Sequence, residues 1–131
     1  MSLPPRRRVV AAPARRPPAE LQAVRVIFEP DPEPDTSYLE QDEFRERFET
    51  YQRDEWHLIG CYAEAEVVIC DVVQTLTGGG LWGIESDSEQ EYLDEIVHGE
   101  WSRLRDVLKT VGVPTDQLPL EVDRAWVEWR T

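Results

Sequence analysis

The sequence has 131 residues, of which 40% are hydrophobic, and a formal net charge of −13. This length suits one domain with a single core, and the five tryptophans argue against a disordered chain. Five of the 14 basic residues and none of the 27 acidic residues fall among residues 1–18, so residues 19–131 carry a net charge of −18. Such an acidic body repels nucleic acid and anionic membranes, and it favours a basic protein as the partner.

The N-terminal segment combines arginine with proline. Proline removes backbone hydrogen-bond donors and arginines repel one another, so we expect residues 1–22 to form a disordered arm ahead of a single acidic domain over residues 23–131. The arm lacks the apolar run of a secretory signal, and no segment reaches the roughly 20 apolar residues of a membrane span. We therefore expect a cytoplasmic protein that does not bind membranes.

The first predicted elements are a strand and a helix. Residues 23–28 form a short β-prone run, and alternating prolines make residues 29–37 an extended loop. Phe44, Phe48 and Tyr51 recur at helical spacing, which predicts an amphipathic helix over residues 42–54.

Two strands follow. Residues 56–69 alternate apolar with polar or small side chains, which is typical of a strand with one buried face. Asp71 is a turn residue, and residues 72–77 are a second β-prone run that we expect to pair antiparallel with the first.

A long helix comes next. Residues 89–111 carry an apolar stripe with one acid in it, Glu100, and Gly112 ends the helix. Ser86 and Ser88 each precede a glutamate by three residues, which predicts a capping box. Gly99 inside the helix predicts either a close approach of another element or a bend.

The final segment, residues 118–130, fits either a helix face or a strand, and we favour a short helix. The order of elements predicts an α+β fold, with a small antiparallel sheet of about three strands covered by two main helices.

Acidic and glycine-rich stretches suggest several kinds of site. Asp31, Glu33 and Asp35 alternate as calcium ligands do, but the prolines between them favour a solvated loop. The four acids at residues 85, 87, 89 and 91 are explained by the dipole at the start of the long helix. The same acids argue against a phosphate loop at residues 78–80.

The cysteines and histidines indicate no chemistry. Cys61 and Cys70 are expected to be reduced and buried. His57 and His98 stand in no catalytic or zinc-binding pattern. We expect no metal, no cofactor and no catalytic residue.

Two motifs carry a resemblance. Residues 35–41, DTSYLEQ, and residues 80–88, GLWGIESDS, followed by Tyr92 and Leu93, resemble a family of small uncharacterised proteins encoded by phages, plasmids and integrative elements of actinobacteria and proteobacteria. The resemblance spans roughly residues 24–112 and implies a mobile-element accessory protein without implying an activity. Gly78 and Gly79 depart from the usual Ser-Pro pair of that family, and both ends of the chain look like additions.

These observations lead us to expect a non-enzymatic protein-interaction module of mobile-element origin that binds a basic protein surface. Aromatic anchors beside carboxylates suit such a partner, and the candidate residues are Asp35, Tyr38, Glu40, Trp82, Glu85 and Asp87. The competing interpretation is that Tyr38 and Trp82 simply fill the core. Two other functions stay open: a DNA-mimicking inhibitor of a host defence nuclease or repressor, and a small enzyme with a carboxylate-based site.

Overall fold

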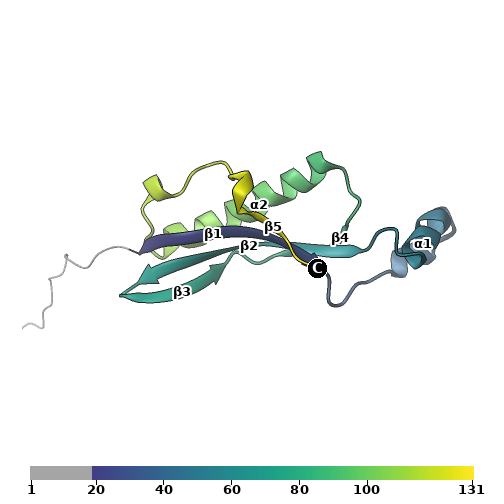
Figure 1. The fold of residues 1–131 in the computed structure, drawn as a ribbon, viewed down its shortest axis with the longest axis horizontal. Helices are drawn as coiled ribbons and strands as arrows, with labels where there is room; N and C mark the ends of the chain where they lie inside the picture. The colour runs from purple at the N-terminus through teal and green to yellow at the C-terminus, as the bar shows by residue number, and fades with distance from the viewer. Residues whose placement is uncertain (1–18) are drawn as a thin grey trace, which may run out of the picture.

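The computed structural model describes residues 19–131 (Figure 1). The strands are β1 (Glu20–Pro30), β2 (Leu58–Ile69), β3 (Val72–Thr77), β4 (Leu81–Glu85) and β5 (Val127–Trp129), and the α-helices are α1 (Arg45–Gln52) and α2 (Gln90–Thr110). The connecting segments contain the short 3-10 helices η2 (Ser37–Glu40), η3 (Asp42–Phe44), η4 (Thr115–Gln117) and η5 (Arg124–Trp126). Most of the predicted arm lies outside the described residues. Its last part, residues 20–22, belongs to β1, which begins three residues before the predicted strand.

The strands form one mixed sheet. Its order is β3-β2-β1-β5, and β4 pairs with the same edge of β2 as β3, but farther toward the start of β2. β1 and β2 are antiparallel, whereas β5 runs parallel to β1. The α+β class is confirmed, but the sheet has five strands instead of about three. The two strands missing from the prediction are short, and Gly83 interrupts β4, so neither gives a clear two-residue period.

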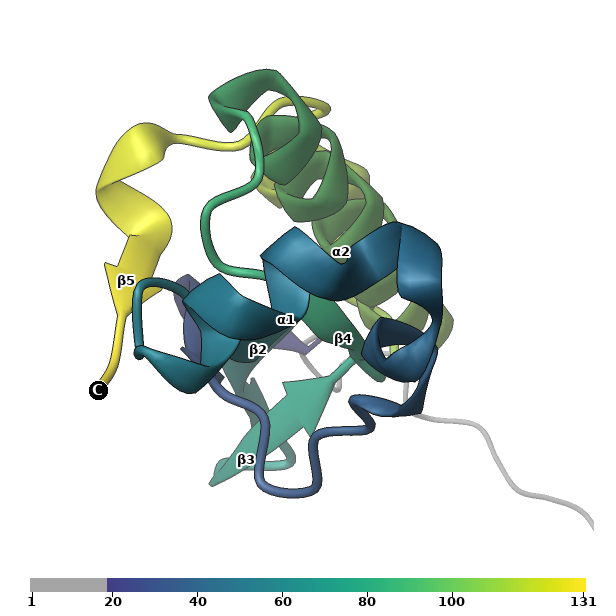
Figure 2. The same ribbon diagram turned by 90° about the vertical axis from the view of Figure 1, so that its right-hand side faces the viewer.

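One helix covers the sheet. Figures 1 and 2 show α2 lying across one face, while α1 sits beyond the end of the sheet. The prediction that two main helices cover the sheet is therefore wrong. No helix of residues 19–131 covers the opposite face, which we call the open face (Figure 2).

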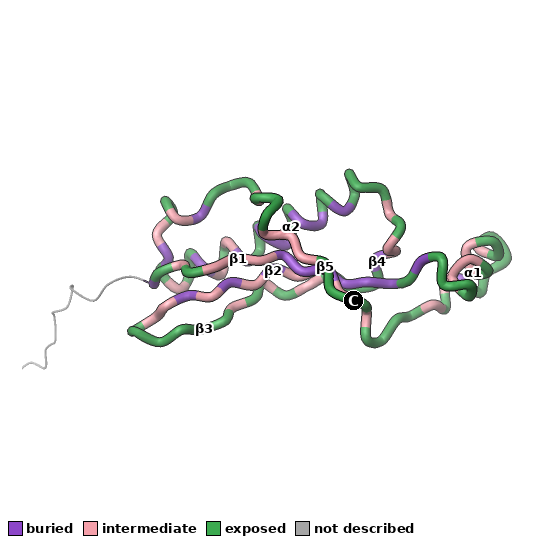
Figure 3. Tube along the Cα trace, viewed as in Figure 1, coloured by how far each residue is buried: buried purple, intermediate pink, exposed green. Residues whose placement is uncertain are grey.

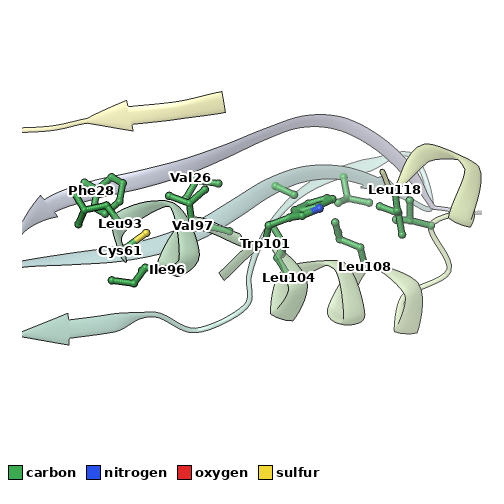
Figure 4. Packing of buried hydrophobic residues seen from close by; sticks show 14 of the residues in the cluster. Val26, Phe28, Cys61, Leu93, Ile96, Val97, Trp101, Leu104, Leu108 and Leu118 are labelled. Carbon is green, nitrogen blue, oxygen red and sulfur yellow. The ribbon is translucent and has the colours of Figure 1, made fainter. Parts of the chain in front are cut away.

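The core lies between α2 and the sheet (Figure 4). Trp101 is 1% exposed, and its indole N–H donates a hydrogen bond to the carbonyl of Pro119 at 2.9 Å. The apolar stripe of α2 meets the inward side chains of β1 and β2, and the cluster includes Val26, Phe28, Ile59, Cys61, Ala63, Ala65, Val67, Leu93, Ile96, Val97, Leu104 and Leu108. The predicted alternation of β2 and the predicted long helix are both confirmed (Figure 3).

The two cysteines differ in their surroundings. Cys61 is buried in the core as predicted, whereas Cys70 is exposed, so the prediction that both are buried is wrong. Cys70 and Asp71 form the turn between β2 and β3, with φ values of +53° and +66°. Positive φ at both central residues is typical of the two-residue hairpin turn, which places Cys70 outside the sheet.

The C-terminal end of α2 agrees with the prediction, whereas its N-terminal end does not. Gly112 has a φ of +98°, the left-handed conformation expected of a residue that ends a helix. At the start, Glu89 is the N-cap residue and no side chain caps the helix, so the predicted capping box is wrong. A Cβ atom at Gly99 would meet nothing within 4 Å, so no element approaches this glycine closely.

A second, smaller cluster holds α1. Leu39, Trp56 and Leu58 are its buried members, and the partly buried residues packed against them are Tyr38, Phe44, Phe48 and Tyr51. The rings of Phe44, Phe48 and Tyr51 therefore all pack against this cluster, as predicted. The α-helix itself begins only at Arg45, after η3.

The C-terminal segment, residues 118–130, contains one 3-10 turn, η5, and then the strand β5 instead of the predicted short α-helix. After η5, residues Val127–Trp129 pair with β1. Trp126 packs edge-on against Trp101 with centroids 5.2 Å apart, and Trp129 stacks on Phe28 with centroids 4.3 Å apart. Trp126 at the end of η5 and Trp129 in β5 thus both find partners on the side of the sheet that faces α2.

Candidate binding site

The structure separates the six candidate residues into two groups and leaves one alone. Tyr38, Glu85 and Asp87 surround Arg47. Asp35 and Trp82 line a hollow on the open face. Glu40 is exposed on η2 and belongs to neither group.

The first group is centred on Arg47, which the sequence analysis did not single out. Its Nη1 and Nη2 donate to the two carboxylate oxygens of Asp87 at 2.8 and 2.9 Å, and Nη2 also donates to Glu85 at 2.7 Å. Its guanidinium carbon lies 3.9 Å from the ring centroid of Trp56. Tyr38 completes the arrangement by donating its hydroxyl hydrogen to Glu85 at 2.6 Å. We call these five residues the Arg47 clamp.

The clamp perturbs the ionisation of its members. The hydrogen bond from Arg47 holds the pKa of Asp87 below its usual range. Burial, and then the hydrogen bond to Glu85, raises the pKa of Tyr38. An aspartate in this setting stays ionised at neutral pH and is a poor proton donor. The clamp therefore ties α1 to the end of β4.

The two serines of this region also hold the chain after β4. Ser86 Oγ accepts a hydrogen bond from the backbone N–H of His57 at 2.9 Å, and Ser88 Oγ donates to the carbonyl of Glu85 at 2.6 Å. The serine pattern that predicted a helix cap instead fixes the connection between β4 and α2.

The second group lines a hollow of about 460 Å³. Its lining residues are Asp31, Pro32, Glu33, Asp35, Trp82 and Gly83, and we call it the Trp82 hollow. Three acidic residues from the segment after β1 thus line one hollow together with Trp82 and Gly83 of β4.

Hydrogen bonds fix two of the three carboxylates. Asp31 accepts from the N–H of Glu33 at 2.9 Å and, through its other oxygen, from the N–H of Gly83 at 3.1 Å. Asp35 accepts from the N–H of Ser37 at 3.0 Å, and hydrogen bonds from Ser37 lower its pKa. The carboxylate of Glu33 is exposed, and among residues 19–131 it has no hydrogen-bond or ion-pair partner.

Trp82 owes its position to glycine. A Cβ atom at Gly60 would lie 1.9 Å from Cε3 of Trp82, so the indole rests directly over the backbone of β2. Tyr62 lies beside it, with ring centroids 6.2 Å apart. Trp82 is 43% exposed and stands on the open face, so the interpretation that it fills the core is wrong. Tyr38 is partly buried in the smaller cluster, where that interpretation holds.

Within residues 19–131, no three side chains of the metal-binding types are grouped to hold an ion. Across the same residues, no helix combines the length and the apolar composition required to cross a bilayer.

No family model, no curated protein and no solved structure matches the chain.

Proposed function

We propose that this protein is a non-enzymatic protein-interaction module, and that the Trp82 hollow takes an arginine side chain from a basic partner. One observation carries the proposal: Trp82, 43% exposed and seated over Gly60, forms a wall of a hollow that three acidic residues also line.

The chemistry of the lining suits a guanidinium group. A cation over an indole face gains roughly 0.5–1 kcal/mol at an exposed site. Arginine combines this stacking with a planar fork of donors, which a carboxylate accepts in a bidentate manner. Glu33, the carboxylate without a partner among the described residues, is the acceptor that we assign to the ligand.

The hollow is also prepared for binding. Pro30, Pro32 and Pro34 restrict the segment that carries the carboxylates, and Asp31 is bonded to the backbone on both sides of the hollow. A preformed site loses little conformational entropy when its ligand binds, so more of the interaction free energy remains as affinity.

The charge of the body adds long-range attraction. Residues 19–131 include all 27 acidic residues and only nine basic ones. A field of this sign raises the association rate of a basic partner, and it weakens as the ionic strength rises. The proposal keeps the cytoplasmic location and the mobile-element origin that the sequence led us to expect.

Fluorescence anisotropy of a labelled arginine-rich peptide tests the proposal. Trp82→Ala and Glu33→Gln are expected to weaken binding several-fold, with unchanged melting of Glu33→Gln. Glu40→Gln is the matched control, since it removes the same charge outside the hollow. A lysine peptide of equal charge is expected to bind more weakly than the arginine peptide.

The same experiment separates the alternative functions. If Glu33→Gln and Glu40→Gln weaken binding equally, and if the arginine and lysine peptides bind alike, then only overall charge matters. That outcome would contradict the hollow and favour the DNA-mimicking inhibitor, for which the charge of the whole surface is the determinant.

A further inference from the structure

The free edge of β5 is a second surface of interest, distinct from the Trp82 hollow. Among the described residues, β5 pairs with β1 on one side and with no strand on the other. Figure 2 shows β5 at the outer margin of the sheet. The N–H of Arg130 donates to the carbonyl of Phe28 at 2.8 Å. Since backbone groups alternate along a strand, the N–H and C=O of Trp129 point away from β1.

The side chains around Trp129 have opposite charges. Glu128 and Arg130 flank it, and they form an ion pair with each other. Arg130 also reaches the hydroxyl of Tyr62, at 3.5 Å, on the open face. Trp129 itself points to the other side, where it stacks on Phe28 and remains 52% exposed.

This arrangement is complementary to itself. We propose that two copies of this chain pair antiparallel through β5, with the two-fold axis at Trp129. In that register, Trp129 of each copy exchanges two backbone hydrogen bonds with Trp129 of the other. Glu128 of each copy then lies directly opposite Arg130 of the second copy, so two attractive charge pairs fix the register.

The surroundings of β5 favour the same partner. A hollow of about 350 Å³ beside the strand is lined by Phe28, Val97, Val127 and Trp129, together with Gln90, Asp94 and Arg124. In the proposed pair, this hollow gives each copy open space beside its exposed Trp129 indole. Residues 124–130 contain two arginines and one acid, so this edge escapes the self-repulsion of the acidic body.

The β3 edge of the sheet offers no such register. β3 exposes Val72 and Val73 and has no charged side chain, so nothing in its sequence selects one alignment of two copies. Val73→Lys on β3 therefore serves as the control for an edge that does not take part.

Sedimentation velocity of the full chain, at physiological ionic strength and over a range of concentrations, tests the proposal. The wild type is expected to show a sedimentation coefficient that rises with concentration. Glu128→Arg alone and Arg130→Glu alone are each expected to remain monomeric, because each places like charges opposite one another. Val73→Lys is expected to associate as the wild type does.

A mixture of the two single variants is the decisive sample. In a mixed pair, the introduced arginine of one chain faces the introduced glutamate of the other. The unaltered Arg130 of the first chain faces the unaltered Glu128 of the second, so association is expected to return. Mixing cannot restore the ion pair within either chain, so recovery reports contact between copies. Glu128→Gln, a milder change, is expected to weaken association by a smaller factor and covers the case in which a charge-reversed chain does not fold.

Three outcomes would overturn the proposal: a monomeric wild type at every concentration, single variants that associate as the wild type does, or a mixture that stays monomeric. Loss of association in Val73→Lys with retention in Glu128→Arg would place the interface on β3 and would overturn it as well.

Discussion

Arg47 grips the carboxylate of Asp87 with two hydrogen bonds, of 2.8 and 2.9 Å, across 40 positions of sequence. The same guanidinium bonds Glu85 and lies over Trp56, so one side chain joins α1, β4 and the smaller hydrophobic cluster. Hydrogen bonds to charged groups contribute about 1.5–3 kcal/mol when they are well shielded. About a third of the Arg47 side chain is exposed, and solvent screening reduces that contribution.

We predict that Arg47→Ala lowers the free energy of unfolding by about 1–2 kcal/mol, as measured by urea denaturation. Arg45→Ala is the control, because Arg45 is exposed on the same helix and belongs to no ion pair among residues 19–131. Equal destabilisation by the two variants would contradict the role of the clamp.

The clamp also predicts a dependence on pH. The folded-state pKa of Asp87 is lowered, chiefly by its hydrogen bond with Arg47. Its contribution to stability is therefore present above the unfolded pKa, and it is lost as the pH falls through the folded pKa. The difference in stability between the wild type and Arg47→Ala should shrink in strong acid, and a difference that stays constant with pH would argue against an ionic clamp.

Glu100 gives the opposite dependence of stability on pH. It is 2% exposed in the core, its Oε1 has no hydrogen-bond partner among the described residues, and Arg103 approaches its other oxygen at 3.3 Å. Burial raises its pKa, although Arg103 opposes the shift. The folded state thus favours the protonated carboxyl, and stability is lost as the pH rises from the unfolded pKa through the folded pKa.

We predict that Glu100→Gln stabilises the protein at pH 8 by on the order of 1 kcal/mol and has little effect near pH 4. Thermal unfolding at the two pH values measures the difference. Glu95→Gln, an exposed acid of the same helix, should show no such dependence. Destabilisation by Glu100→Gln at pH 8 would mean that the ion pair with Arg103 outweighs the cost of burial.

A substitution at Gly60 would displace the Trp82 indole without changing Trp82 itself. A methyl group at Gly60 would lie 1.9 Å from Cε3 and 2.2 Å from Cζ3 of the indole, so the ring must leave its seat. We predict that Gly60→Ala costs about 1–3 kcal/mol of stability, a typical overpacking penalty, and weakens binding of the arginine peptide as Trp82→Ala does.

Gly99→Ala is the matched change at an open site. Nothing lies within 4 Å of its Cβ position and the residue is helical, so alanine should stabilise α2 by about 0.5–1 kcal/mol and leave peptide binding unchanged. Full peptide binding by Gly60→Ala would show that the seat of Trp82 does not matter to the hollow.

The elements that could be predicted from sequence are those with a sustained period. β2 and α2 are long enough for alternation and for the helical stripe to be unambiguous, and β3 follows β2 through a two-residue turn. β5 has only three residues, and its one tryptophan, Trp129, fits both the helical and the strand period, so only tertiary packing decides between them.

The candidate site was harder to predict, because its two halves depend on distant contacts. Glu85, the last residue of β4, and Asp87 alternate with serines ahead of a helix, which is a local pattern that imitates a cap. Their true partner, Arg47, lies 38 and 40 positions away and carries no local signal. The chemistry of their side chains marks Asp35 and Trp82 as candidates from sequence alone, whereas Asp31 and Gly83 join the hollow through a hydrogen bond that only the folded chain reveals.

The packing of α2 and the shape of the Trp82 hollow both depend on one pairing register of β2. Cys61 faces the core and Gly60 faces the open side, so consecutive residues of this strand support α2 and seat Trp82. A slip of one residue along β2 would turn Gly60 toward α2 and present a larger side chain to the indole. An insertion within this strand would therefore dismantle the Trp82 hollow while every residue that lines it remained unchanged.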